Sequence, residues 1–297
     1  MKRVLIRCLF AVLVATCAAQ VHPKTASRAD QAPGICDRVQ DGAFHSAALD
    51  REMKYRILLP CRYQTGSGRF PVLYLLHGLY GDYLNWDTRT NLERYAQEYE
   101  LIVVMPDAGD SWYTNSATDS GDKFEDYIAK DMVAEIDGKF RTLRSRHARA
   151  IAGLSMGGYG ALKIALRYPD DFAFAGSLSG ALNAPQDLGD RQPAVRKQLL
   201  KVFGAPGSVV RADNNVFSMF QNAGAKDLPY FYVACGSADD FLPVNRDFVA
   251  QLASRGAVYE YHETAGGHSW DYWDQSLPDL LRAVADVVSS QHRHISE

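Results

Sequence analysis

One stretch constrains the fold of this chain more than any other: residues 149–160, which carry a Gly-x-Ser-x-Gly pattern with Ser155 at its centre. A short apolar run precedes the pattern, and a run compatible with a helix, residues 161–168, follows it. This order is typical of a nucleophile elbow, whose serine occupies a strained turn and needs small residues two positions away on either side. Gly153 and Gly157 meet that requirement. We therefore expect Ser155 to be a nucleophile; the alternative is a glycine-rich βα turn in which it only caps the helix.

Strand and helix patterns alternate along the remainder of the chain. The expected strands are a hairpin of 39–46 and 51–59, then 72–76, 101–105, the run before Ser155, 174–178, 230–234 and 258–262. The expected helices are 87–99, 124–143, 161–168, 194–203, 243–255 and 278–289. Apolar strands separated by helices indicate an α/β fold with a mainly parallel, doubly wound sheet, to which the N-terminal hairpin adds an antiparallel edge.

Length and charge limit the class of protein further. The chain has 297 residues, of which 47% are hydrophobic, and this is enough to bury one large core. We expect one domain over residues 35–292, with an irregular insertion at about 180–228, and the sequence shows no repeat or linker that would divide it. A net charge of -3 without a dense basic block gives no reason to expect a nucleic-acid partner.

The N-terminus has the layout of a secretory signal peptide. Residues 1–19 begin with basic residues, continue with a mostly apolar run and end in small residues up to Ala19, after which cleavage is expected. Residues 20–34 would then form a loose leader. The apolar run is too short for a comfortable membrane span, so we expect no stable membrane anchor. A lipoprotein through Cys17 is less favoured, because Thr16 is a poor residue before a lipidated cysteine. The prediction is a secreted or periplasmic protein.

Export would expose the cysteines of the mature chain to an oxidising compartment. In the predicted hairpin, residue 46 lies opposite residue 51, and continuing this register outward sets Cys36 opposite Cys61. Directly opposed positions have Cβ separations compatible with a disulfide, so we predict a Cys36–Cys61 bridge. Cys235 ends an apolar strand and is expected to be a buried small hydrophobic residue.

A nucleophilic serine needs a base within hydrogen-bond reach and a carboxylate that orients the base. Asp239 and Asp240 both follow an apolar strand, and we prefer Asp239 because Asp240 suits a helix cap. His268 follows two glycines after the next strand, which lets the backbone bring its imidazole over Ser155. Among the other histidines only His77 rivals it, and His77 precedes the serine in the chain. The predicted triad is therefore Ser155, Asp239 and His268.

Attack on an acyl carbon places negative charge on the carbonyl oxygen, and backbone N–H groups aimed at that oxygen stabilise the transition state. We expect one donor to be the N–H of Met156, at the start of the helix after Ser155, where the helix dipole also helps. The second should come from the loop that begins at His77; Leu79 is preferred, with Tyr80 as the alternative. His77 itself is expected to brace this loop by hydrogen bonds.

At these residues the chain resembles the esterase D-like branch of the α/β-hydrolases. This branch includes S-formylglutathione hydrolases, feruloyl and acetyl-xylan esterases, tributyrin esterases, enterochelin esterases and mycobacterial mycolyltransferases. The resemblance covers roughly residues 40–290 and implies an α/β-hydrolase fold with Ser155, Asp239 and His268 as the triad. It rests on these stretches: His77-Gly78-Leu79, Met105-Pro106-Asp107, Ser111-Trp112-Tyr113, Gly153-Leu154-Ser155-Met156-Gly157-Gly158, Cys235-Gly236-x-x-Asp239 and Gly266-Gly267-His268-x-Trp270-x-x-Trp273.

Two departures limit what the resemblance implies about substrate. S-formylglutathione hydrolases are cytosolic, which does not fit a signal peptide. Mycolyltransferases need a long lipid groove, and the 180–228 insertion shows no long apolar surface. Aromatic residues near the expected site, whose flat rings could stack on a phenolic acyl group or a sugar, are the predicted substrate contacts: Tyr80, Trp86, Trp112, Tyr113 and Trp270. Trp273 is assigned to the scaffold.

The leading hypothesis is an exported serine carboxylesterase that acts on short-chain acyl esters, or on feruloyl or acetyl esters of carbohydrates, through an acyl-enzyme. An acyltransferase on the same triad is the alternative, followed by a non-catalytic binding member of the fold, which would need a damaged triad. A small-molecule or carbohydrate ester is the expected partner. No cofactor is expected, and no close His/Cys/Asp cluster has the spacing of metal ligands. The sequence does not determine the oligomeric state.

Overall fold

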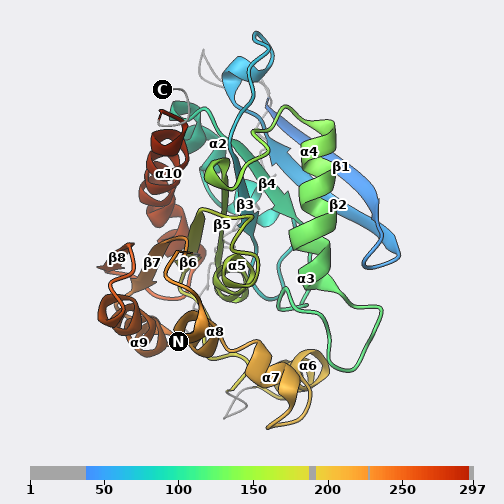
Figure 1. Cartoon of the computed structure of the whole chain (residues 1–297), viewed down its shortest axis with the longest axis vertical. Coiled ribbons are helices and arrows are strands. Elements are labelled where there is room, and N and C mark those ends of the chain that lie inside the picture. The colour runs from blue at the N-terminus through green and yellow to red at the C-terminus, as the bar shows by residue number, and fades with distance from the viewer. Residues whose placement is uncertain (1–37, 187–191, 227, 294–297) are drawn as a thin grey trace, which may run out of the picture. The chain divides into compact units, whose positions relative to one another are not determined.

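A computed structural model describes residues 38–186, 192–226 and 228–293. Within them, eight strands form one sheet in the order β1-β2-β4-β3-β5-β6-β7-β8 (Figure 1). The pairs β1–β2 and β2–β4 are antiparallel, and every other pair is parallel, which confirms the predicted sheet and its antiparallel hairpin. The strands are β1 (Val39–Ser46), β2 (Arg51–Leu58), β3 (Val72–Leu76), β4 (Ile102–Pro106), β5 (Arg149–Leu154), β6 (Phe174–Leu178), β7 (Tyr230–Gly236) and β8 (Tyr259–Thr264).

The central strands are apolar throughout because helices cover both faces of the sheet. Alternate residues of β3 enter two different cores: Val72 and Leu76 face one, whereas Leu73 and Leu75 face the other. The first core is closed by α5 (Met156–Arg167) together with α4 (Val133–Lys139). The second is closed by α10 (Trp270–Arg293), which lies on the other side of the sheet in Figure 1.

The expected helix over residues 87–99 is broken. The structure has α1 (Asn85–Arg89), α2 (Leu92–Tyr95) and a 3-10 turn, Ala96–Glu98. Thr90 is extended between the first two, and the backbone N–H of Asn91 donates to Asp274 of α10 at 2.7 Å. A contact to a distant helix thus replaces a bond within the helix.

The expected helix over 124–143 is shorter than predicted and changes its winding. It starts as α3 (Phe124–Asp126), continues as a π-helical segment, Tyr127–Met132, and ends with α4 at Lys139. The chain leaves the helix because residues 140–143 turn extended and pair with Phe70, whose N–H donates to the carbonyl of Arg141 at 2.9 Å.

The last helix begins earlier than predicted. α10 starts at Trp270, and Pro278, the expected start, lies inside it. The proline removes one backbone donor, but burial of Leu277, Leu280 and Val284 in the second core compensates for that loss. The remaining helices are α6 (Pro193–Phe203), α7 (Val209–Asp213) and α8 (Val216–Asn222) in the stretch 180–228, and α9 (Leu242–Ser254) after it.

The hairpin has the predicted register, with Ser46 opposite Arg51 and Val39 opposite Leu58. Cys36 lies outside the described residues, so its bridge to Cys61 stays a prediction. The signal peptide, residues 1–19, and the leader, residues 20–34, lie outside them as well. No helix in the described part of the chain is long and apolar enough to span a membrane.

Candidate active site

Ser155 stands at the turn between β5 and α5, with φ 53° and ψ −114°. This is a left-handed conformation that costs a non-glycine residue of the order of 1–3 kcal/mol. Gly153 and Gly157 allow it, because a Cβ on Gly153 would lie 2.6 Å from the backbone carbon of Gly157. Met156 is the first residue of α5, so its N–H has no acceptor within the helix. The strand–turn–helix order expected around Ser155 is confirmed.

The structure brings three residues from separate loops together at the carboxyl ends of the strands. His268 Nε2 lies 3.0 Å from Ser155 Oγ, and His268 Nδ1 lies 3.0 Å from Asp239 Oδ2. The Asp239 side chain is fully buried, whereas that of His268 is 34% exposed. Asp240 is exposed. The geometry therefore favours Asp239 over Asp240 as the carboxylate that orients the imidazole.

Asp239 is held by more than the histidine. Its Oδ1 accepts the N–H of Phe241 at 2.9 Å, and its carboxylate also accepts a hydrogen bond from Ser179. Burial alone would raise the pKa of Asp239, but the hydrogen bonds from His268, Phe241 and Ser179 leave that pKa below its usual value. The carboxylate is thus stabilised in its ionised form.

Sequence reasoning missed Ser179. It follows β6 directly and has a positive φ of 51°, and its Oγ accepts the indole N–H of Trp273 at 3.2 Å. It therefore links Asp239 to a buried tryptophan of α10. The only signal available was its place at the carboxyl end of a buried strand, beside the two strands that carry Ser155 and Asp239.

His77 braces the loop after β3, as expected. Its Nε2 accepts the N–H of Ala108 at 3.1 Å, so the proton of the neutral ring is on Nδ1 and is donated to the carbonyl of Gly78 at 2.8 Å. Burial lowers the pKa of His77, which keeps the ring neutral. The N–H of Tyr80 already donates to Asp110 at 2.6 Å, which favours Leu79 over Tyr80 as a donor to a bound oxyanion.

A cavity of about 800 Å³ opens at Ser155 and His268. Of the five predicted substrate contacts, Tyr80, Trp112 and Trp270 line it together with Leu79. Phe241 and Arg89 also lie in its wall. Tyr80 is 66% exposed, so most of its side chain is accessible to a ligand.

The prediction of substrate contacts at Trp86 and Tyr113 is wrong. Both rings are in the core, 1% and 0% exposed, and neither lines the cavity. The indole N–H of Trp86 donates to the carbonyl of Leu76, and the Tyr113 hydroxyl donates to the carbonyl of His77. Their polar groups satisfy backbone carbonyls, so their rings support the site from behind.

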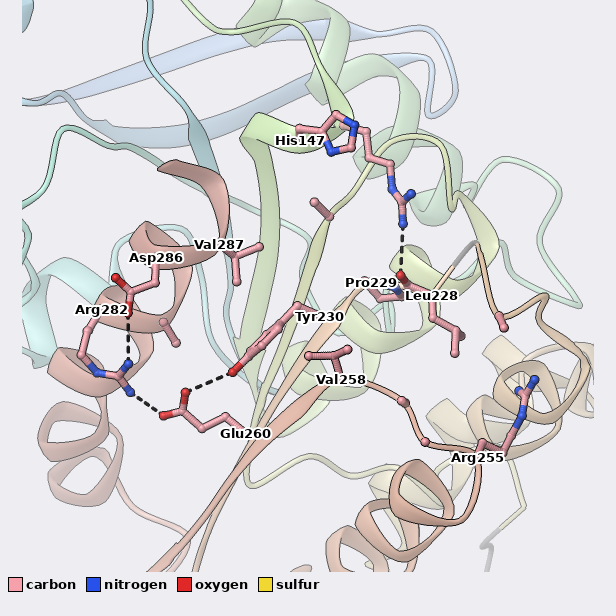
Figure 2. A pocket seen from close by; sticks show the side chains of 16 residues that line it. His147, Leu228, Pro229, Tyr230, Arg255, Val258, Glu260, Arg282, Asp286 and Val287 are labelled. Carbon is pink, nitrogen blue, oxygen red and sulfur yellow. Dashed lines mark hydrogen bonds and ion pairs between the residues drawn. The ribbon is translucent and has the colours of Figure 1, made fainter. Parts of the chain in front are cut away.

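A second cavity, of about 660 Å³, lies at the opposite ends of β6, β7 and β8 (Figure 2). Three of its charged groups are paired with one another, since Arg282 forms ion pairs with Glu260 and with Asp286. The Tyr230 hydroxyl donates to Glu260 at 3.2 Å. The described residues of its lining include no serine, threonine or cysteine. This cavity therefore has no nucleophile of the kind found at Ser155.

Cys235 is free and fully buried, as expected, and burial raises the pKa of its thiol to about 12. Among the described residues, no group of three or more His, Cys, Asp or Glu side chains could hold a metal ion.

The site has a strained serine at a strand–helix turn, and this serine is hydrogen-bonded to an imidazole that a buried carboxylate orients. This arrangement defines a serine hydrolase of the α/β-hydrolase fold. The family model described as "Putative esterase" matches residues 46–284. The chain belongs to this esterase family, and it is an enzyme that acts on carboxylic ester bonds.

Relatives with known names support the same class. An acetyl esterase of Caldicellulosiruptor saccharolyticus is 28% identical over 82% of this chain and 97% of its own. Esterase Rv1288 of Mycobacterium tuberculosis is 31% identical over 85% of this chain, which spans 59% of that relative's length. The diacylglycerol acyltransferase/mycolyltransferase Ag85A of the same species is 25% identical over 95% of this chain and 92% of its own.

Solved structures agree with the fold. The fluorophosphonate-binding serine hydrolase FphF of Staphylococcus aureus aligns with TM-score 0.75 and 28% identity, over 83% of this chain and 98% of its own. The S-formylglutathione hydrolase FrmB of the same organism gives 0.73 and 28%, with the same coverage. A ferulic acid esterase gives 0.73 and 27%, over 84% and 98%.

Proposed function

We propose that this protein is an exported serine carboxylesterase that hydrolyses short-chain acyl esters, or feruloyl or acetyl esters of carbohydrates, through an acyl-enzyme. The observation that carries the proposal is the continuous hydrogen-bonded chain from Ser155 Oγ through His268 to Asp239, at 3.0 Å for each bond. The intact triad argues against a non-catalytic binding protein.

In the proposed mechanism, Ser155 Oγ attacks the acyl carbon while His268 Nε2 takes its proton. Asp239 accepts a hydrogen bond from the Nδ1–H of His268, which sets the tautomer and stabilises the imidazolium. The N–H groups of Met156 and Leu79 are the proposed donors to the oxyanion, aided by the N-terminus of α5. The alcohol leaves with the proton from His268. A water then attacks the acyl-enzyme with His268 again as the base, the bond between the acyl carbon and Ser155 Oγ breaks, and the acid leaves as Ser155 Oγ takes the proton back from His268.

The proposed substrate class follows from the cavity. Its volume of about 800 Å³ suits a small acyl group with part of its alcohol, and Tyr80, Trp112 and Trp270 offer aromatic surface in its wall. Two similar proteins are named for ester classes of this kind, an acetyl esterase and a ferulic acid esterase. The proposal of export rests on the signal-peptide pattern of residues 1–19.

Acyl transfer to an alcohol is the second candidate, since similarity extends to a mycolyltransferase. Hydrolysis is preferred because the side chain of His268 is 34% exposed, so water reaches the base directly. A transferase on this triad would have to exclude water and bind an acceptor instead.

The proposal is tested with a fluorophosphonate probe on the wild type and on Ser155→Ala, followed by p-nitrophenyl, feruloyl and acetyl-sugar esters. We expect labelling and hydrolysis by the wild type and neither by the variant. An unlabelled and inactive wild type would refute the enzyme assignment. Product analysis with added alcohols then separates the two reactions, because a transferase yields the new ester in place of the free acid.

A further inference from the structure

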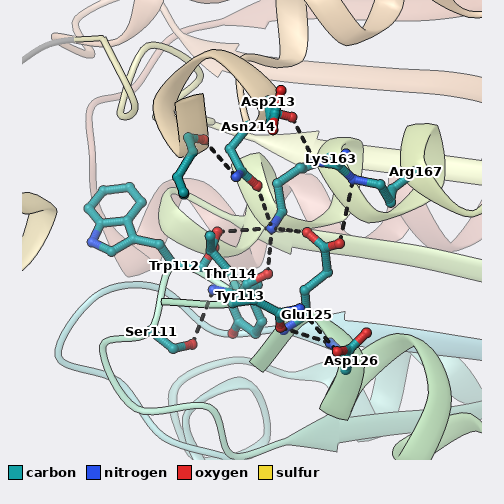
Figure 3. Close-up of polar contacts among 12 residues, drawn as sticks. Ser111, Trp112, Tyr113, Thr114, Glu125, Asp126, Lys163, Arg167, Asp213 and Asn214 are labelled. Atoms are coloured by element: carbon teal, nitrogen blue, oxygen red, sulfur yellow. Dashed lines mark hydrogen bonds and ion pairs between the residues drawn. The ribbon is translucent and has the colours of Figure 1, made fainter. Parts of the chain in front are cut away.

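Lys163 is buried completely, in α5 eight residues after Ser155. Its ammonium donates to Glu125 Oε2 at 2.6 Å, to the carbonyl of Tyr113 at 2.7 Å and to Thr114 Oγ1 at 2.9 Å, and it lies 3.3 Å from Asn214 Oδ1 (Figure 3). Lysine is almost never fully buried unless it is paired, because its charge loses its hydration. Two of these bonds go to one loop, residues 111–114.

That loop has an unfavourable backbone. Trp112 and Tyr113 are consecutive non-glycine residues with φ values of 55° and 51°. Left-handed residues of this kind persist only where their surroundings hold them. Within the loop, the N–H of Tyr113 donates to Ser111 Oγ and Thr114 Oγ1 donates to the carbonyl of Trp112. Lys163 supplies the bonds that tie this loop to α5.

The loop in turn contacts the active site on two sides. Trp112 lines the cavity at Ser155. The Tyr113 ring packs on α5 so closely that a Cβ on Gly160 would lie 2.5 Å from it. The Tyr113 hydroxyl donates to the carbonyl of His77 at 2.8 Å, at the start of the loop that carries Leu79.

We propose that Lys163 is a positioning residue for the oxyanion site. Paired with Glu125, it holds Tyr113 so that the Tyr113 hydroxyl fixes the backbone at His77 and thereby the N–H of Leu79. The inference rests on the proposed function, because it assigns Leu79 as a donor to the oxyanion. It assigns Lys163 no contact with substrate or with the reacting atoms.

The position of Glu125 explains how the ammonium is retained. The Glu125 side chain is 9% exposed. One of its carboxylate oxygens pairs with Lys163, and Arg167 lies 3.5 Å from the other. Removing Lys163 alone would leave this carboxylate buried without its closest partner, a change that strongly destabilises the fold. A variant that removes both charges avoids this difficulty.

The test therefore uses the full mature chain with Lys163→Met/Glu125→Leu, which replaces the pair by apolar side chains of similar size. The double variant still lacks the donor to the carbonyl of Tyr113. The matched control is Arg149→Met/Asp137→Asn, which removes another ion pair of low exposure, 2.9 Å long and at the opposite end of β5. Thermal unfolding first establishes that both variants are folded at 25 °C.

Esterase kinetics then test whether Lys163 positions the oxyanion site. We expect kcat of the Lys163→Met/Glu125→Leu variant to fall about 10- to 100-fold with KM within about threefold, because donors to the oxyanion act in the transition state alone. The control should keep both constants within about twofold. A Lys163→Met/Glu125→Leu variant that is folded and keeps kcat within twofold, or that changes KM alone, overturns the inference. An inactive and unlabelled wild type would instead refute the proposed function.

Discussion

Gly157 offers a sharp test of the geometry behind Ser155. A Cβ added at Gly157 would lie 2.5 Å from the carbonyl oxygen of Leu76 and 2.6 Å from that of His77. Both are backbone atoms of β3 and the loop after it, so no side-chain rotation can relieve the overlap. In Gly157→Ala, α5 must therefore move away from β3 by several tenths of an ångström, and it carries the N–H of Met156 with it.

Two opposing effects set the size of the change in Gly157→Ala. Overpacking of this kind costs about 1–3 kcal/mol, and the better helix propensity of alanine offsets at most about 1 kcal/mol. We expect the free energy of unfolding to fall by about 1–2 kcal/mol. Because displacements of about 1 Å in an active site cost about 100-fold, we expect kcat/KM to fall by about 10- to 100-fold.

Urea unfolding and p-nitrophenyl ester kinetics measure the two effects. Gly138→Ala is the matched control, since Gly138 lies in α4 and a Cβ there would meet no atom within 4 Å. We expect that control to be unchanged or stabilised by up to about 1 kcal/mol, with normal kinetics. If Gly157→Ala has the same midpoint and kcat/KM as the wild type, the close packing of α5 on β3 does not constrain the site.

Three further predictions concern the groups around the triad. Asp239→Asn should lower kcat about 10³- to 10⁴-fold by favouring the wrong tautomer of the base, while Asp240→Asn stays within about twofold; equal effects in steady-state assays would contradict the assignment. Ser179→Ala leaves the indole N–H of Trp273 without its acceptor and should lower the free energy of unfolding by about 1–3 kcal/mol in urea titrations. The pKa of His77 is lowered from 6.5 by burial, so below pH 6.5 the unfolded state binds more protons. The free energy of unfolding should then decrease as the pH is lowered, by at most about 1.4 kcal/mol per pH unit. His77→Gln should flatten the plot of this free energy against pH between pH 6.5 and 5; an unchanged slope would refute the assignment to His77.

Local sequence determined the main elements of this protein. The pattern around Ser155 predicted a strand, a tight turn and a helix, and the apolar runs predicted the parallel strands, because burial on both faces leaves a signal in consecutive residues. Strand-end glycines also indicated the loop of His268. These features depend on neighbours along the chain, so the sequence carries them directly.

The tertiary structure decided everything that depends on partners far apart in sequence. It favoured Asp239 over Asp240 and Leu79 over Tyr80, because only the fold shows which carboxylate meets His268 and which N–H is already occupied. It moved Trp86 and Tyr113 into the core, since an aromatic residue in a loop looks the same in sequence whether its ring is exposed or buried. It also ended the helix after Phe124 at Lys139, where pairing of the following residues with Phe70 outweighs the helical pattern.

Ser179 and Lys163 illustrate the same limit at the site itself. Each is a single polar residue within or beside an apolar element, and no local pattern marks it as special. Their importance follows from contacts over 50 to 94 positions of sequence, from Lys163 to Tyr113 and from Ser179 to Trp273. The chain's own pattern thus placed the nucleophile at Ser155, while packing between distant segments determined which groups hold and orient the residues around it.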